Sequence, residues 1–167
     1  MSKAQVIGDR WLNQLLNQTK KNSNYTQNLW VGIGFKRGSS QQLMTIAIQE
    51  IFKKNLLEES AIAGLATINT KASDTALVEL CYLRNWRLKT FSAEHLSTVA
   101  VPNPEEIITK ATGTPSVAEA AAILAAVKNQ GLDTKLLVAK QIFRLSGQPG
   151  TVTIAVAEEI FPTNQQL

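Results

Sequence analysis

The sequence predicts one α/β domain with three layers, in which helices cover both faces of a mixed, mostly parallel sheet of about five strands. Short apolar runs alternate with amphipathic stretches along residues 29–91, which is the β-α-β-α-β order typical of parallel strands. Two β-prone runs then follow without a helix between them, which predicts an antiparallel hairpin. The length of 167 residues suits one domain with a sizeable core.

The first strand is predicted over Leu29–Gly34, a short apolar run that ends at a glycine. A basic glycine loop follows at 35–38. Ser39 with Gln42 three residues later has the spacing of a capping box, so a helix is expected from there to about Lys54.

The second unit repeats this order. Ala61–Ile68 reads as a buried strand, and Ser73 or Asp74 is expected to cap the next helix. That helix contains Cys81 in an apolar run, and the chain's one cysteine is therefore expected to be a buried thiol without a disulfide. Arg87–Phe91 alternates in polarity and predicts a third strand.

Two helix starts open the second half of the chain. Asn103 followed by a proline predicts a short helix to about Lys110. Ser116 and Glu119 have the capping-box spacing, and the alanine-rich stretch that they open should end near Gly131. The broad small-residue face of this helix would let it lie close to a sheet.

The hairpin and the two ends of the chain complete the organisation. The two strands of the hairpin are predicted at Lys135–Lys140 and Val152–Ala157, and a loose tail is expected over 158–167. At the other end, 1–28 reads as an amphipathic helix and a polar linker outside the core. The main domain is accordingly expected to span 29–167.

Composition limits the classes of function. The formal net charge of +4 favours anionic partners. The basic residues are scattered and aromatics make up only 6% of the chain, which speaks against a nucleic-acid partner. One cysteine and one histidine cannot form a zinc-type ligand cluster, so no metal site is predicted. With neither a signal peptide nor a long apolar run, we expect a cytoplasmic protein without a membrane partner.

Several groups that suit an anion are expected at the carboxyl edge of the sheet. Basic side chains follow the first and second strands, and a serine follows the third. A loop with two threonines, a glycine and a helix N-terminus precedes the alanine-rich helix, and such a terminus favours carboxylate or phosphate. Parallel strands would bring these groups to one edge. The predicted ligand-binding residues are Gly34, Lys36, Arg37, Gly38, Lys71, Ser92, Thr112, Gly113, Thr114 and Ser116.

Two more specific functions, dinucleotide binding and acid–base catalysis, find less support in the sequence. The glycines of the first loop miss dinucleotide-binding spacing by one residue, and Asn69 stands where an acidic residue would bind a ribose. For acid–base chemistry the candidates are Glu94, His95 and Glu119. Each has a plain structural alternative, because Glu119 fits a capping role and the other two fit an exposed helix surface.

Six motifs follow one another along the domain. They are Val31–Gly38, Leu65–Ile68 with Lys71, Phe91–Glu94, Val101–Pro104, Gly113–Ala121, and Leu137–Lys140 before Val152–Ala157. In this register they resemble the CobE / CbiG C-terminal domain family of cobalamin biosynthesis, in its stand-alone, CobE-like form. Two positions depart from the pattern: Phe35 stands where the family often has cysteine, and Ala139 where it often has proline.

The resemblance implies a role in corrin-ring assembly, with a precorrin or cobalt-precorrin as the anionic tetrapyrrole partner. It implies either cobalt-precorrin-5A hydrolase activity, which opens a lactone, releases acetaldehyde and acts on a carbon–carbon bond, or a part of that activity. The alternative is a non-catalytic precorrin carrier that docks with other cobalamin biosynthesis enzymes. No cofactor is implied beyond cobalt inside the bound tetrapyrrole. A homodimer is compatible with either form.

Overall fold

The computed structural model describes residues 27–101, 116–127 and 134–160. Its centre is a five-stranded sheet in the order β3-β2-β1-β5-β4. β1 pairs in parallel with β2, and β2 with β3, while β5 is antiparallel to both β1 and β4. The predicted mixed, mostly parallel sheet is thereby confirmed. The strands are β1 (Leu29–Phe35), β2 (Ile62–Ile68), β3 (Arg87–Phe91), β4 (Thr134–Phe143) and β5 (Val152–Glu159).

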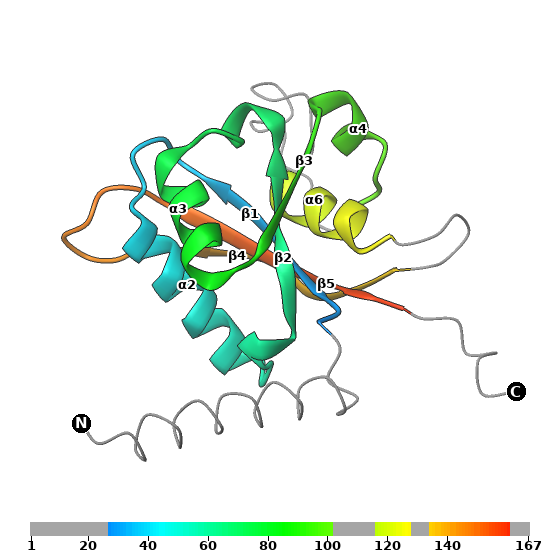
Figure 1. Ribbon diagram of the computed structural model, residues 1–167, viewed down its shortest axis with the longest axis horizontal. Coiled ribbons are helices and arrows are strands. Elements are labelled where there is room, and N and C mark those ends of the chain that lie inside the picture. The colour runs from blue at the N-terminus through cyan, green and yellow to red at the C-terminus, as the bar shows by residue number, and fades with distance from the viewer. Residues whose placement is uncertain (1–26, 102–115, 128–133, 161–167) are drawn as a thin grey trace, which may run out of the picture.

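Helices cover both faces of this sheet, as Figure 1 shows. α2 and α3 lie on one side, and α6 and α4 lie together on the other. Within the described ranges, no helix is long and apolar enough to cross a membrane. The helices are α2 (Gln41–Lys54), α3 (Thr75–Arg84), α4 (Ala93–Ser97) and α6 (Val117–Ala126), with short 3-10 turns η1 (Glu59–Ala61) and η2 (Asn69–Lys71).

Large apolar side chains fill the layer between the sheet and the α2/α3 pair. Val31, Ile33 and Phe35 face this layer from β1, because alternate residues of a strand point to the same side. Cys81 of α3 lies in the same cluster and is 7% exposed, which confirms the predicted buried thiol. Other members of the cluster are Leu43, Met44, Ile48, Phe52, Leu65, Leu77 and Leu80.

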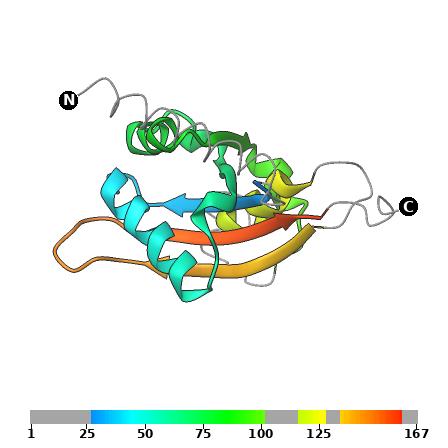
Figure 2. The same ribbon diagram turned by 60° about the horizontal axis from the view of Figure 1, so that its bottom comes forward.

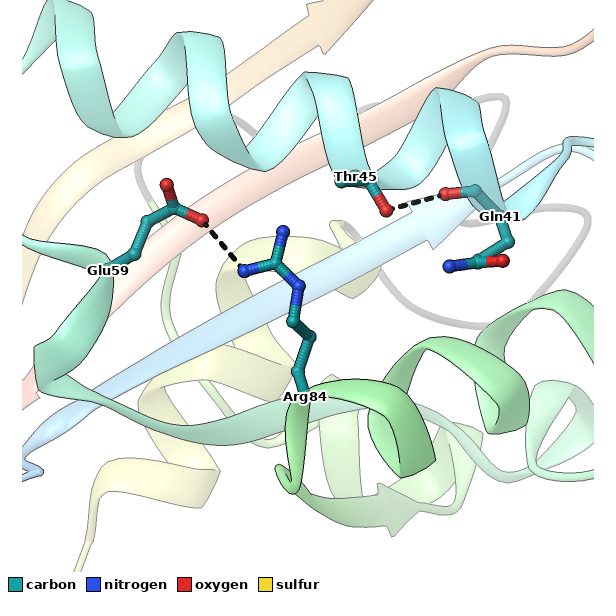
Figure 3. Close-up of polar contacts among 4 residues, drawn as sticks. All are labelled: Gln41, Thr45, Glu59 and Arg84. Atoms are coloured by element: carbon teal, nitrogen blue, oxygen red, sulfur yellow. Dashed lines mark hydrogen bonds and ion pairs between the residues drawn. The ribbon is translucent and has the colours of Figure 1, made fainter. Parts of the chain in front are cut away.

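The polar contacts at the border of this layer contribute little to stability. Figure 3 shows Arg84, at the end of α3, reaching Glu59 of η1 at 3.6 Å, with both side chains 35% exposed. In α2, the Thr45 hydroxyl donates to the Gln41 carbonyl oxygen one turn earlier. Partly exposed ion pairs of this kind contribute little to stability, so packing holds α2 and α3 in place.

The opposite layer is thin because its residues are small. α6 presents alanines to the sheet, and Gly32 of β1 faces it. A Cβ on Gly32 would overlap the carbonyl oxygen of Ala118, so only glycine allows this approach. The alanines buried there are Ala118, Ala120, Ala121, Ala122, Ala125 and Ala126.

The hairpin of β4 and β5 forms the other half of the sheet, and Figure 2 shows it as a long curved ribbon whose loop extends beyond the remaining strands. The antiparallel pairing is the predicted one. β5 runs to Glu159, so the expectation of a loose tail from residue 158 is wrong at its start. The end of β5 is paired on both sides, since Glu158 lies opposite Leu29 of β1 and Lys135 of β4, and the Trp30 indole N–H also donates to the Glu159 carboxylate at 2.7 Å.

The helix caps agree with the sequence in part. Asp74 caps α3 by accepting from Leu77 N, one of the two predicted alternatives. Ser40, rather than Ser39, caps α2 by accepting from Leu43 N. Both serines fit the local pattern, and Ser39 is instead occupied by a contact with Thr151, directly before β5.

Some predictions fall on parts of the chain that the structure does not describe. These are the N-terminal amphipathic helix, the helix expected from Asn103 to Lys110, and the loop at Thr112, Gly113 and Thr114. The expectation that the alanine-rich helix ends near Gly131 is wrong, because α6 ends at Ala126 and Val127 has an extended backbone.

Candidate functional site

A pocket of about 670 Å³ opens at the edge of the sheet where β1, β2 and β4 end and β5 begins. The first residues of α6, together with Ser116 before them, close one side. Open α/β sheets bind ligands beyond the carboxyl ends of their strands. The volume also falls in the range of about 300–1,000 Å³ that is usual for small-molecule sites. This pocket is therefore the candidate site.

All charged side chains that line the pocket, among the described residues, are cations. Threonine and serine hydroxyls lie between them, and Phe35, Ile68, Val117 and Ile142 supply apolar surface. Such a lining attracts a ligand that combines several negative charges with an apolar body. The cations are Lys36, Arg37, Lys71, Lys140 and Arg144, and the hydroxyl residues are Thr67, Thr70, Ser116, Thr151 and Thr153.

Lys36 and Arg37 are presented by a loop that is tied to the start of β5. Lys36 N donates to the Thr151 carbonyl oxygen at 3.0 Å. The Ser39 hydroxyl accepts from Thr151 N at 3.2 Å and donates back to the Thr151 carbonyl oxygen at 3.3 Å. Gly38 turns the loop with φ +91°, a value that favours glycine. The two cationic side chains are exposed at the mouth of the pocket, on a backbone held at both ends.

Lys71 is held by an aromatic ring. It lies in η2, directly after β2, and its Nζ is 4.7 Å from the centroid of the Phe35 ring. A cation over an aromatic face is attracted by the ring's negative face. This contact aims the ammonium toward the pocket that both residues line.

Gly34 keeps the floor of the pocket open. It faces α6 from β1, and a Cβ placed on it would have Thr153 Cβ at 3.9 Å and Val117 Cβ at 4.0 Å as its nearest neighbours. A side chain would therefore fit there but would occupy ligand space. The Thr67 hydroxyl nearby is already engaged, since it donates to the Ile33 carbonyl oxygen at 2.6 Å.

The predicted capping box of α6 is wrong. Ser116 precedes the helix and is 1% exposed, but its side chain makes no capping hydrogen bond. Glu119 is fully buried, and its Oε2 accepts from Lys140 N at 2.9 Å. The carboxylate thus bonds to the edge strand β4, because α6 packs so closely that the strand backbone comes within its reach. Ser116 lines the pocket instead.

The residues predicted after β3 do not join the pocket lining. The Ser92 hydroxyl caps α4 by accepting from His95 N at 3.1 Å. Glu94 and His95 are exposed on that short helix, and His95 packs edge-on against the Phe91 ring at 5.5 Å. Of the predicted binding residues, Gly34, Lys36, Arg37, Lys71 and Ser116 come together, while Gly38 and Ser92 do not line the pocket.

Sequence reasoning missed the contribution of the hairpin. Lys140, Arg144 and Thr153 all line the pocket. Desolvation by the surrounding protein lowers the pKa of the Lys140 ammonium, because burial disfavours a charged form. The signal was the period of two along β5, which puts Thr153 on the α6 side with Ala155 and Ala157, whereas two register shifts interrupt this period along β4. Among the described residues, no group of three or more metal-binding side chains gathers in one place.

Comparison with known families gives a match over most of the domain. Residues 29–157 match the family model described as cobalamin synthesis G C-terminus. This chain belongs to that family. The match covers the whole described sheet except the end of β5.

The match to one individual relative is consistent with this family. A cobalt-precorrin-5A hydrolase from Priestia megaterium is 29% identical over 129 residues, which are 77% of this chain and 32% of the relative. The chain therefore spans about a third of that protein's length.

Two solved structures share the fold. CobE, a protein from the cobalamin (vitamin B12) biosynthetic pathway, is 26% identical with a TM-score of 0.69, covering 80% of this chain and 95% of CobE. The cobalamin biosynthesis protein chiG from Agrobacterium tumefaciens str. C58 is 25% identical with a TM-score of 0.55, covering 78% of this chain and 97% of that protein. The homologues thus act in cobalamin biosynthesis.

Proposed function

We propose that this chain binds an anionic tetrapyrrole, a precorrin or cobalt-precorrin, in its basic pocket during assembly of the corrin ring. The observation that carries the proposal is the charge of the pocket: five cations and, among the described lining residues, no carboxylate. Cobalt would enter only as part of the ligand. The relatives in cobalamin biosynthesis support the choice of a tetrapyrrole among anionic ligands.

The chemistry of such a ligand suits the lining. Precorrins carry acetate and propionate carboxylates around an apolar macrocycle. Arg37 and Arg144 can each pair with a carboxylate through two parallel hydrogen bonds, whereas the lysines act as point charges. Apolar side chains such as Val117 and Ile142 offer surface to the macrocycle.

Whether the chain hydrolyses its ligand depends on a general base. Lactone opening needs a group that activates water and a site that stabilises the oxyanion. Glu94 and His95 stand on α4 outside the pocket lining, and Glu119 is buried with a backbone partner. We therefore infer that the chain supplies the ligand-binding part of a cobalt-precorrin-5A hydrolase. The alternative is a non-catalytic carrier, which the cationic, base-free lining of the described pocket also favours.

A binding titration tests the proposed ligand. Purified protein is mixed with cobalt-precorrin-5A without oxygen while the visible spectrum is followed. The Lys36→Ala/Arg37→Ala double variant should bind more weakly, by about 1 kcal/mol or more for each cation that no longer pairs with a ligand carboxylate. Binding should also weaken with added salt, because exposed charges are screened.

The matched control removes two cations elsewhere. Lys53 and Lys54 are exposed at the end of α2 and border a different hollow, between α2 and β4. Lys53→Ala/Lys54→Ala should bind like the unaltered protein. Equal affinity of the two double variants would contradict the assignment of the pocket.

Acetaldehyde release separates the two forms of the proposal. A spectral change with stoichiometric acetaldehyde would mean that the chain is a complete hydrolase. A spectral change without acetaldehyde would favour the binding part or the carrier. If the spectrum stayed the same at every protein concentration, the tetrapyrrole proposal would fail.

A further inference from the structure

β4 carries two extra residues opposite β5. Leu136 pairs with Ala157 and Gln141 pairs with Ile154, so five steps along β4 are matched by three along β5. The register shifts once between Leu136 and Val138, and again between Val138 and Gln141. Shifts of this kind are β-bulges, which bend a strand and re-aim side chains.

The first shift turns Val138 to the α2/α3 side, and the second returns Lys140 to the side of the pocket. Leu136 packs on the α6 side of the sheet, Val138 in the α2/α3 layer, and Lys140 lines the pocket on the α6 side. An uninterrupted strand would place all three on one face, because its side-chain period is two. After Val138, an unshifted ladder would turn Lys140 toward the α2/α3 side. The second shift therefore brings Lys140 to the pocket.

Glu119 bonds to the backbone at this second shift. A bulge leaves a residue out of the regular ladder, and its N–H then needs another acceptor. Lys140 N donates to Glu119 Oε2 at 2.9 Å, and Glu119 is fully buried in the first turn of α6. A hydrogen bond from a backbone N–H to a carboxylate is stronger than one to a neutral acceptor.

We propose that Glu119 is a positioning residue that holds the bulge of β4 so that the Lys140 ammonium faces the pocket and pairs with a carboxylate of the ligand. The inference rests on the proposed function for the ligand and on the ladder for the geometry. It gives a role to a buried acid that lies beside a cationic pocket without lining it. Glu119 acts through Lys140 and does not itself touch the ligand.

A double-variant cycle tests this coupling. The probe is uroporphyrin, a tetrapyrrole with eight carboxylates, titrated by its fluorescence. Lys140→Ala should weaken binding roughly tenfold, the effect of removing one ion pair with the ligand. Glu119→Ala should weaken it to the same degree, and the Glu119→Ala/Lys140→Ala double variant no further. Glu119→Gln keeps an acceptor oxygen and should recover most of the affinity.

Two outcomes of the cycle would overturn the proposal. One is unaltered affinity in Glu119→Ala alongside a loss in Lys140→Ala, because Lys140 would then be positioned without Glu119. The other is a double variant that loses the product of both single effects, because the two residues would then act independently.

A second measurement needs no ligand and keeps the test open if Glu119→Ala does not fold. Amide hydrogen exchange of Lys140 should accelerate in Glu119→Gln, because a neutral amide accepts more weakly than a carboxylate. The control is Glu79→Gln, at an exposed position of α3, which should leave that rate unaltered. Unaltered exchange in Glu119→Gln would overturn the positioning role. Failure of the unaltered protein to bind uroporphyrin, with accelerated exchange, would overturn the ligand alone.

Discussion

The two faces of the sheet are packed in opposite ways. On the α2/α3 side, long side chains such as Met44, Ile48 and Phe52 separate helix from sheet and form a buried apolar layer. On the α6 side, alanines and Gly32 bring the helix backbone almost onto β1. The thick layer has the composition of an ordinary core, whereas the thin layer depends on the absence of side chains.

This difference explains why the pocket lies on the α6 side. A helix that approaches closely brings its first turn beside the ends of β1 and β2, so polar groups from several elements border one space. It also brings the Glu119 carboxylate within reach of the β4 backbone. On the other side, large side chains fill the layer between the helices and the sheet, and the hollow there lies at the end of α2, between α2 and β4. Close packing on one face thus builds the site.

The largest expected effect comes from adding a side chain to the thin layer. Gly32→Val should lower the free energy of unfolding by about 3 kcal/mol or more, the upper end for overpacked cores, because its Cβ would overlap the Ala118 carbonyl and meet Ala122 Cβ at 2.9 Å. Urea unfolding followed by circular dichroism measures this loss.

Gly34→Ala is the matched control in the same strand. Its Cβ would have 3.9 Å to its nearest neighbour, so stability should stay within about 1 kcal/mol of the original. Ligand binding should weaken, because the methyl group enters the pocket. Similar stability losses for Gly32→Val and Gly34→Ala would contradict the account of the thin layer.

The free energy of unfolding should depend on pH because a thiol is buried in the thick layer. Burial raises the pKa of the Cys81 thiol from 9.0 to about 11. The folded state therefore keeps the proton more tightly, and this stabilisation is complete below pH 9 and lost as pH rises toward 11. Between about pH 8 and pH 10 the loss should be about 1 kcal/mol.

Urea unfolding at both pH values, compared with Cys81→Ala, isolates this contribution from other titrating groups. The variant should lose less stability over the same interval. An identical pH dependence in the two proteins would mean that the thiol is not desolvated by the layer.

A small effect is also expected where a large side chain of the thick layer is shortened. Ile48→Val removes one methylene from α2 at a position that is 1% exposed. A loss of about 1 kcal/mol is typical of this change in a core. Thermal unfolding should show a lower Tm with the pocket's ligand affinity intact. A loss as large as that of Gly32→Val would remove the contrast between the two layers.

Much of the fold could be predicted because its signals are local. β3 runs over Arg87–Phe91 as expected, and the bounds of β1 and β2 differ from the prediction by one residue. Apolar runs and cap residues report on their own few neighbours. The N-cap of α2 is Ser40 and not the predicted Ser39. Adjacent serines fit the same sequence pattern, and the contact of Ser39 with Thr151 decides between them.

The candidate site could be predicted only where it follows strand ends. Lys36, Arg37 and Lys71 come directly after parallel strands, and topology brings them to one edge. Lys140 and Arg144 were missed because they belong to the hairpin, whose place beside the pocket follows from the strand order β1-β5-β4 and not from a spacing in the sequence.

The sequence by itself determined the order of elements, the α/β class, the small-residue helix and the family resemblance, because these depend on composition and spacing along the chain. Tertiary structure alone decided the partner of Glu119. Its distance from Ser116 along the chain fits a capping box, yet its carboxylate bonds to Lys140, 21 residues away. The reason is physical: a buried carboxylate takes the donor that packing supplies, and the close approach of α6 to the sheet supplies the backbone of β4.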